Sequence, residues 1–340
     1  MKSKQIVLLG IIFAVLVLGV CVKELQKPKE LSVEEYAPLQ FSFDTGVIEK
    51  ILLSKAAEKS IELVKENGQW RIPGLWNARA DENAIQKFLA ETRQAKGEVR
   101  SSDSSLLKDF GLGDDQALSV SLFEKSEKPA VRFFIGGERA EDGFVFLKFE
   151  NSDMVYLAQA DLLTPMKVYG SLNEKKLSAE SWAALNPFPF EPSQVTGLEL
   201  KRVEKGKENV TVALEAVKEG DKKNWHSSKK DVPFKMASEK VEAFLFSLTN
   251  VQAAKVLDPK ASGFDAPVWQ MQLTLEGGRE ILVKAKPEEN EGEGASHVMM
   301  QISTEPVLFQ ISKHYFETLD IEDKQFAPEE PAKPEQPKVS

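Results

Sequence analysis

The stretch IELVKENGQWRI, residues 61–72, carries the clearest signal for the fold. Apolar and polar residues alternate on both sides of Asn67-Gly68. Two-residue hairpin turns favour this dipeptide because both of its positions adopt positive φ. We therefore predict a β-hairpin in which Trp70 and Ile72 lie on the returning strand and share one apolar face.

An amphipathic helix is expected directly after this hairpin. Ile85, Phe88, Leu89 and Thr92 have the i, i+3, i+4, i+7 spacing of one helix face. Asp81 precedes them and is a good N-cap acceptor for the first turn. Further alternating stretches predict more hairpins, pairing residues 118–122 with 131–135, 144–146 with 155–157, 271–275 with 281–283, and 298–300 with 307–309. Antiparallel hairpins that accompany a single main helix indicate an α+β fold.

The pattern of the first half recurs about 155 residues later. Trp70 recurs as Trp225, an offset of 155, and Phe88 recurs as Phe244, an offset of 156. Ser238 precedes the second helix, where we expect it to act as the N-cap. At a constant shift of 156 the apolar helix face maps onto Val241, Phe244, Leu245 and Leu248. A period this long predicts two tandem copies of one domain, since solenoid repeats are far shorter.

Prolines divide the chain between the two halves. The segment Asn186-Pro187-Phe188-Pro189-Phe190-Glu191-Pro192 forbids a helix and interrupts a sheet. We predict a cytoplasmic tail (1–5), a transmembrane anchor (6–22), a polar tether (23–42), a first α+β repeat domain (43–185), a Pro-rich linker (186–192), a second, diverged α+β repeat domain (193–322) and a disordered tail rich in Pro, Glu and Lys (323–340).

Two aromatic residues in this linker are the candidate partner-contact residues of the chain. Phe188 and Phe190 are flanked by prolines. They either wedge the two domains together, which we favour, or present an extended apolar ridge to a partner. Trp70 and Trp225 have equivalent positions after a turn, and we interpret both as core residues of their domains.

The N-terminus predicts a membrane anchor. Ile6 to Val22 is a run of seventeen residues without a charge or a proline, preceded by Lys2 and Lys4. As a helix the run measures about 25 Å, close to the hydrocarbon thickness of a bilayer. No A-x-A pattern of small residues follows it, so an uncleaved anchor is preferred to a signal peptide. We expect a single-pass protein of the inner or plasma membrane, with the N-terminus in the cytoplasm and the bulk of the chain in the periplasm.

The lone cysteine leaves a second form of attachment open. Leu18, Gly19 and Val20 precede Cys21 and half resemble a lipoprotein processing site. Val20 stands where Gly, Ala or Ser is expected, so lipidation of Cys21 is the less favoured interpretation. A chain with one cysteine fits an oxidising or a reducing compartment equally well.

Composition disfavours nucleic-acid binding. The 340 residues have a formal net charge of −9, and subtracting Lys2 and Lys4 leaves −11 beyond the apolar segment. No basic run of five or more residues offsets this charge. Such a surface repels phosphate backbones, so we expect no nucleic-acid partner.

No sequence motif for catalysis, a metal or a cofactor is present. His226, His297 and His314 stand far apart, and one cysteine cannot form a Cys-based zinc site. Gly111-Leu112-Gly113 lacks the third glycine of a dinucleotide fingerprint, and there is no phosphate-binding P-loop and no G-x-S-x-G elbow. We therefore predict no catalytic, cofactor-binding or metal-ligating residues, and a protein that is not an enzyme.

Four short motifs follow the N-terminal anchor: Gly68-Gln69-Trp70, Ala80-Asp81, Phe110-Gly111-Leu112 and Ile135-Gly136-Gly137. With the anchor, they resemble the bacterial family of domain of unknown function 4340. The resemblance covers residues 43–185 well, whereas the second half has Phe264-Asp265-Ala266 in place of Phe-Gly-Leu and no Gly-Gly after Val283.

The resemblance implies an envelope protein of unknown biochemistry, often encoded near gliding-motility-type ABC transporter components. It supplies no catalytic residues. Our first hypothesis is therefore an accessory or scaffold protein of an ABC-type system, bound to the membrane through residues 6–22 and to an envelope protein partner. The alternative is an envelope hydrolase that acts on cell-wall or saccharide material, which would require two buried carboxylates facing each other in a cleft between the copies.

Overall fold

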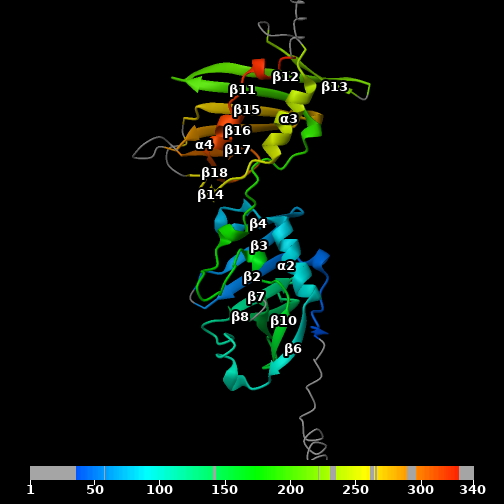
Figure 1. Cartoon of the computed structure of the whole chain (residues 1–340), viewed down its shortest axis with the longest axis vertical. Helices are drawn as coiled ribbons and strands as arrows, with labels where there is room; N and C mark the ends of the chain where they lie inside the picture. Colours follow the sequence, from blue (N-terminus) through cyan, green and yellow to red (C-terminus); the bar gives the residue numbers. More distant parts are fainter. Residues whose placement is uncertain are drawn as a thin grey trace, which may run out of the picture.

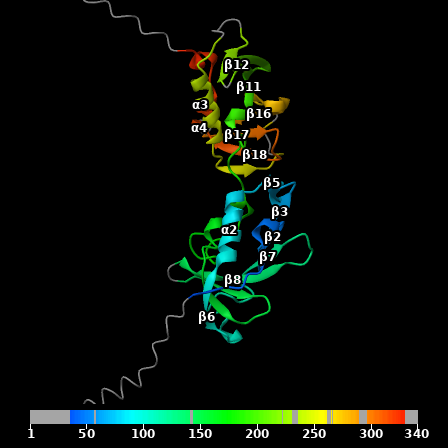
Figure 2. The ribbon, with the colours of Figure 1, turned by 90° about the vertical axis from the view of Figure 1, so that its right-hand side faces the viewer.

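The computed structural model describes residues 36–328 except 57, 141–142, 221, 230–234, 261–263, 265 and 289–295. Figure 1 shows two lobes in series along the long axis, and Figure 2 shows the same separation after a turn of 90°. We call residues 36–185 the first lobe and residues 193–328 the second lobe. Each lobe contains one sheet and one main helix.

The first lobe is built on a ten-stranded sheet whose printed strand pairs are all antiparallel. Its strand order is β1-β6-β10-β9-β8-β7-β2-β3-β4-β5. The strands are β1 (Ala37–Pro38), β2 (Lys50–Lys55), β3 (Ile61–Glu66), β4 (Gln69–Ile72), β5 (Ala78–Arg79), β6 (Lys96–Ser101), β7 (Leu118–Phe123), β8 (Val131–Arg139), β9 (Val145–Phe149) and β10 (Val155–Gln159).

The second lobe is built on an eight-stranded antiparallel sheet. Its strand order is β13-β12-β11-β15-β16-β17-β18-β14. The strands are β11 (Val195–Glu204), β12 (Lys207–Glu219), β13 (Lys222–Ser227), β14 (Lys255–Leu257), β15 (Trp269–Leu275), β16 (Glu280–Pro287), β17 (His297–Ile302) and β18 (Leu308–Ser312).

Helices are few in the described residues. The α-helices there are α2 (Glu82–Gln94), α3 (Ser238–Thr249) and α4 (Lys313–Leu319). The 3-10 helices are η1 (Thr45–Val47), η2 (Pro73–Leu75), η3 (Ser104–Leu106), η5 (Thr164–Met166), η6 (Ala179–Trp182), η7 (Pro192–Gln194), η8 (Glu276–Gly278) and η9 (Asp323–Phe326). Two antiparallel sheets with few helices agree with the predicted α+β class.

No helix in the described part of the chain is both long enough and apolar enough to cross a membrane. The predicted anchor at residues 6–22, Cys21 and the cytoplasmic tail all lie outside the described residues.

The two sheets share one strand order. In the first sheet the strands from β6 to β4 run β6-β10-β9-β8-β7-β2-β3-β4. In the second sheet the whole order, taken from the other edge, runs β14-β18-β17-β16-β15-β11-β12-β13. In both shared orders a meander of three consecutive strands, β2-β3-β4 or β11-β12-β13, occupies one end, and the strand that follows the main helix, β6 or β14, takes the other end. The first sheet adds the short strands β1 and β5 at its two edges.

The hairpin predicted from residues 61–72 is confirmed. Glu66 pairs with Gln69, so Asn67 and Gly68 form a two-residue turn with φ of 51° and 83°. Positive φ at both positions is the geometry that an Asn-Gly turn adopts. The alternation then places the side chain of Trp70 in the core.

The predicted helix faces are confirmed, but one of the two caps is not. In α2 the buried residues are Ile85, Phe88, Leu89 and Thr92, and in α3 they are Val241, Phe244, Leu245 and Leu248. The Asp81 carboxylate accepts from the backbone N–H of Ala84 at 3.2 Å, as an N-cap should. Ser238 is the first residue inside α3, and its hydroxyl accepts from the backbone N–H of Trp225 at 3.2 Å. Ser238 therefore ties α3 to β13 instead of capping the helix.

Two predicted boundaries are corrected by the structure. The sequence predicts residues 36–42 as tether, but Ala37–Pro38 pairs with β6 and Phe41 is buried against Phe133. It predicts residues 323–328 as tail, but η9 packs on the second lobe and the Phe326 carbonyl accepts from the N–H of Ala237. Both segments are short, and their burial depends on partners far away in the sequence.

Candidate functional site at the junction of the lobes

The chain that joins the lobes is hydrogen-bonded to both of them. Ala184 donates its backbone N–H to the carbonyl of Arg79 in the first lobe at 2.9 Å. One residue later, the carbonyl of Leu185 accepts from the N–H of Ala253 in the second lobe at 2.8 Å. Two adjacent residues at the start of the joining chain are therefore hydrogen-bonded, one to each lobe.

Phe188 and Phe190 lie inside this junction and not on its surface. Their exposed fractions are 1% and 8%, and their ring centroids are 6.2 Å apart in an edge-to-face arrangement. Asn186 accepts from the N–H of Phe188 at 2.8 Å and donates to the carbonyl of Thr249 at 3.1 Å. Burial of both rings supports the wedge interpretation and argues against an exposed apolar ridge. Contact of these rings with a partner remains a prediction.

A carboxylate from the second lobe pairs with two arginines from the first. Glu305 lies in the turn between β17 and β18, and its side chain is 3% exposed. Its Oε1 lies 2.9 Å from Nε of Arg79, and its Oε2 lies 3.2 Å from Nη1 of Arg71. Arg79 also donates to the carbonyl of Asn186. We call Arg71, Arg79 and Glu305 the junction ion cluster, and it joins both lobes and the linking segment.

Lys223, on the edge strand β13 at the side of the second sheet opposite to β14, holds the start of the second lobe. Its Nζ donates to the carbonyl of Ser193 at 2.9 Å and to that of Val195, and it lies 5.3 Å from the ring centroid of Trp225. Burial lowers the pKa of Lys223 below its usual value. The backbone carbonyls and the aromatic face compensate part of the cost of removing this ammonium from water.

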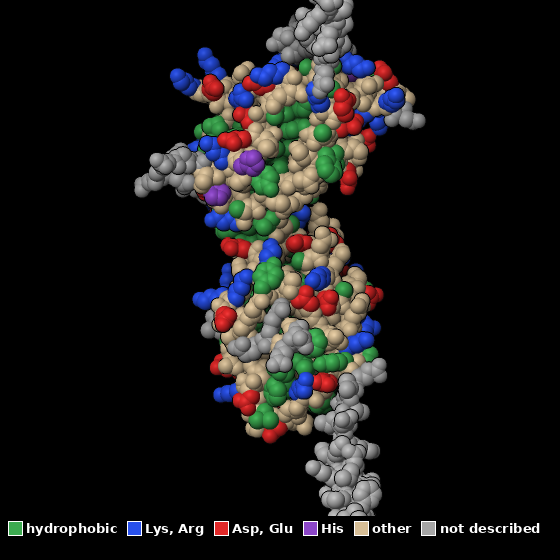
Figure 3. Space-filling view, viewed as in Figure 1, with side chains coloured by type: hydrophobic (Ala, Val, Ile, Leu, Met, Phe, Trp, Pro, Cys, Tyr) green, Lys and Arg blue, Asp and Glu red, His purple; other side chains and the backbone are tan. Residues whose placement is uncertain are grey.

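Three cavities adjoin the junction. The largest of the three, which we call the interlobe cleft, has a volume of about 750 Å³ and is lined by both lobes. A second, of about 410 Å³, lies beside Arg71 and Glu305. The smallest has a volume of about 130 Å³ and lies between the junction ion cluster, Phe188, Phe190 and Arg279. Figure 3 shows that the molecule narrows between the lobes and that basic and acidic side chains are interspersed on the visible face.

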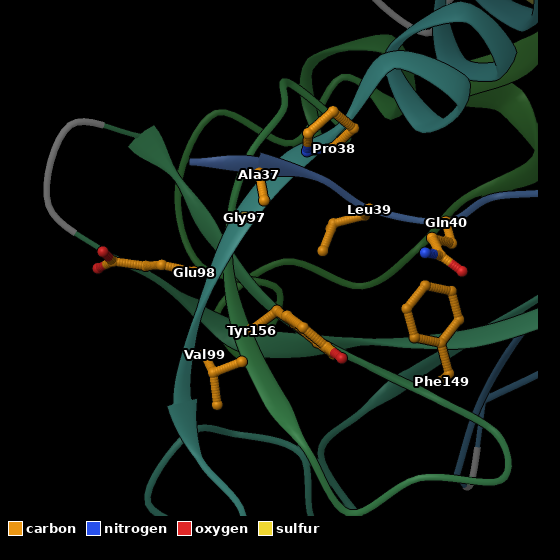
Figure 4. Close-up of a pocket in the computed structure, with 9 residues that line it drawn as sticks. All are labelled: Ala37, Pro38, Leu39, Gln40, Gly97, Glu98, Val99, Phe149 and Tyr156. Carbon is orange, nitrogen blue, oxygen red and sulfur yellow. The ribbon is translucent and has the colours of Figure 1, made fainter. Parts of the chain in front are cut away.

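Another cavity, of about 580 Å³, lies at the edge of the first sheet (Figure 4). Leu39, Phe149 and Tyr156 surround it, and Val99 is a half-exposed part of its wall. The side chain of Glu98 points away from these residues. The lining is mainly apolar and brings together no pair of acid and base groups.

The family motifs Phe110-Gly111 and Gly136-Gly137 meet in one place. Gly137 donates its N–H to the carbonyl of Gly111 at 3.0 Å, and its own carbonyl accepts from the N–H of Leu172 at 2.8 Å. A Cβ added at Gly136 would overlap the carbonyl oxygen of Phe110, and one added at Gly137 would overlap the side chain of Asn173. These glycines allow close backbone approach, so the motifs serve packing.

The described residues contain no cluster of three or more His, Cys, Asp or Glu side chains with metal-binding geometry. Two buried carboxylates are notable, but each has its own cation. Asp323 pairs with Lys229 at 2.7 Å on the second lobe, whereas Glu305 pairs with the two arginines at the junction. These two groups do not form the facing pair that the hydrolase hypothesis requires.

Sequence reasoning identified Phe188, Phe190, Trp70 and Trp225, and all four side chains are buried in one continuous core cluster. This burial supports the interpretation of the two tryptophans as core residues. The junction ion cluster was missed. Glu305 is 226 residues from Arg79 and 234 residues from Arg71 in the sequence, and no local sequence pattern predicts a pairing over such a separation.

Comparisons with known proteins give one family. The family model of DUF4340, a domain of unknown function, matches residues 70–267, which is more than half of the chain. The match begins at Trp70 and continues through the linking segment and α3, so it extends well beyond residue 185. No curated protein and no solved structure matches the chain. The chain belongs to the DUF4340 family.

Proposed function

We propose that this protein is a membrane-anchored, extracytoplasmic accessory or scaffold protein. The observation that carries the proposal is the serial arrangement of the lobes. The first described residues lie in the half of the first lobe that faces away from the second, and the last described residues lie at the far end of the second lobe (Figures 1 and 2). An anchor at residues 6–22 would thus hold the first lobe near the bilayer and the second lobe away from it.

We propose further that the lobes are tandem copies of one fold. The shared strand order and the equivalent buried faces of α2 and α3 support this duplication. The junction ion cluster and the buried rings of Phe188 and Phe190 favour a fixed orientation between the copies. A fixed orientation suits a scaffold, because it presents the second lobe at a defined height.

The outer face of α3 is the surface on which we propose to search for a partner. Phe246 is 62% exposed there, beside Ala243 and Ser247. At the equivalent position of α2, a shift of 156, stands Ala90. Large exposed aromatic side chains are enriched at protein interfaces. The family resemblance suggests an envelope protein of an ABC-type transport system as the partner.

Photo-crosslinking in native membranes tests this function. The full chain carries a photoreactive amino acid at Phe246, and the control carries it at Ala90 on α2. We expect a membrane or envelope protein to crosslink to the Phe246 position and not to the control. Recovery of the full chain in the soluble cytoplasmic fraction, or equal crosslinking at both positions, would contradict the proposal.

A further inference from the structure

The interlobe cleft has the size and position of a ligand site. Its volume of about 750 Å³ falls in the range of small-molecule pockets, roughly 300–1,000 Å³. The first lobe contributes β4 and the first turn of α2, and the second lobe contributes Gln252, just after α3. Ligand sites occur preferentially between domains, because two walls can enclose a molecule there.

The lining of the cleft is rich in side-chain amides. An amide presents two donors beside an acceptor, and a sugar hydroxyl both donates and accepts, so the two groups match in pairs. Within the described residues, the side chains of Asn83 and Gln252 form no hydrogen bond, and Gln86 uses one donor on Glu82 at 3.1 Å. The amides of the lining are Gln69, Asn83, Gln86, Asn186 and Gln252.

The charges of the cleft disfavour an anionic ligand. The guanidinium of Arg79 is already paired with Glu305 and with the carbonyl of Asn186. Asp81 and Glu82 then leave the cleft with an excess of negative charge. Phosphorylated ligands such as nucleotides would be repelled by these carboxylates.

The backbone around the cleft disfavours an extended peptide. Peptides often bind by adding a strand to an open sheet edge. Here the edge beyond β5 is occupied by the end of the first lobe, because Ala80 bridges to Ala183 and Ala184 donates to the carbonyl of Arg79. The hydrogen-bonding groups that remain for a ligand belong mainly to side chains.

From these observations we infer that the interlobe cleft binds a neutral, hydroxyl-rich ligand, namely an uncharged oligosaccharide. Asn83 from the first lobe and Gln252 from the second would both bind it. The inference does not depend on the scaffold function, since it concerns a cavity and not the outer face of α3.

Isothermal titration of the full chain with neutral tetrasaccharides tests the inference. The probes are chitotetraose, cellotetraose and maltotetraose, and the detergent must lack a sugar headgroup, because a maltoside would itself occupy the cleft. We expect at least one probe to bind, and the double variant Asn83→Ala/Gln252→Ala to weaken that binding at least tenfold. Gln94→Ala removes an exposed amide from the other end of α2 and should leave the affinity unchanged.

Intrinsic fluorescence is a second measurement of binding, and it does not depend on the double variant being folded. Trp70 lines the cleft, so binding should change the intrinsic fluorescence, and Trp70→Phe should reduce that change. The inference is overturned if none of the three neutral probes binds, or if the double variant binds as tightly as Gln94→Ala. Tighter binding of glucose-6-phosphate or of tetra-alanine than of every neutral probe would also overturn it.

Discussion

The two lobes share a strand order, yet they complete their packing differently. In the first lobe, the segment around Phe110 and Leu112 forms a small separate cluster with Val155 on the sheet. In the second lobe, α4 follows β18 directly, and its Phe316 packs edge-to-face on Trp269 with ring centroids 5.6 Å apart. The sheet and its main helix are common to both lobes, whereas the additional packing elements differ.

This difference explains why the family motifs are uneven along the chain. Gly136 and Gly137 are required where the loop around Phe110 and Gly111 lies against β8. The second lobe has no Phe-Gly-Leu and no Gly-Gly after Val283, and Ala285 is fully buried on the corresponding strand β16. The Phe-Gly-Leu and Gly-Gly motifs are therefore absent together from the second lobe. This is expected if the glycines are needed only where the Phe-Gly-Leu loop packs on the strand.

The largest expected effect comes from removing the equivalent tryptophans. Trp70→Ala and Trp225→Ala should each lower the free energy of unfolding of their own lobe by about 3–5 kcal/mol, because both side chains are buried. Chemical denaturation followed by near-ultraviolet circular dichroism measures the loss. Trp76→Ala is the control, because Trp76 is half-exposed. A cost below about 1 kcal/mol for only one variant would break the equivalence of the lobes.

The next effect concerns the contact between the lobes. Glu305→Ala leaves two largely buried guanidinium groups without their carboxylate and should cost about 3 kcal/mol. We expect calorimetry to resolve two unfolding transitions more clearly than in the unmodified chain. Glu276→Ala is the control: it breaks the exposed pair with Lys218 and should leave the unfolding profile nearly unchanged. An unchanged calorimetric profile in Glu305→Ala would show that contacts other than the junction ion cluster join the lobes.

A smaller effect sharpens the difference in packing. Gly136→Ala should destabilise the first lobe by about 1–3 kcal/mol, because the new Cβ meets a backbone carbonyl that cannot rotate away. Gly74→Ala is the matched control, since no atom lies within 4 Å of its added Cβ. Thermal unfolding of both variants measures the difference. Equal melting temperatures for Gly136→Ala and Gly74→Ala would contradict the packing role of the glycine motif.

The smallest expected effect is a pH dependence of the stability of the first lobe. Burial tends to raise the pKa of Asp161, but hydrogen bonds from Thr164 and Lys87 outweigh it and hold the pKa below its usual value. This carboxylate therefore stabilises the fold above its unfolded-state pKa, and that contribution is lost as the pH falls below about 4. The residue of α3 equivalent to Lys87 is Ala243.

Asp161→Asn tests this dependence. The pair is partly exposed, so the variant should lose less than about 1 kcal/mol at neutral pH and show a flatter loss of stability in acid. Urea unfolding at a series of pH values checks both expectations. A parallel pH profile for the variant and the unmodified chain would contradict the assignment.

Local patterns predicted most of the secondary structure and little of the junction. The Asn67-Gly68 turn and the apolar faces of α2 and α3 depend on neighbours within a few residues, so the sequence expresses them directly. Ala37–Pro38 and Phe326 were misassigned because each is ordered only by contact with a distant element. The cation partners of Glu305 lie in the other lobe, and only the folded chain brings them together.

The way Arg79 is bound has a mechanical consequence. Its guanidinium contacts Glu305 in one lobe and the Asn186 carbonyl in the connecting chain, while its own carbonyl accepts from Ala184. A tensile force along the long axis would load these contacts in parallel with the covalent chain. Because the chain from Asn186 to Pro192 is folded around two buried rings, the arginine contacts would rupture before that chain could straighten.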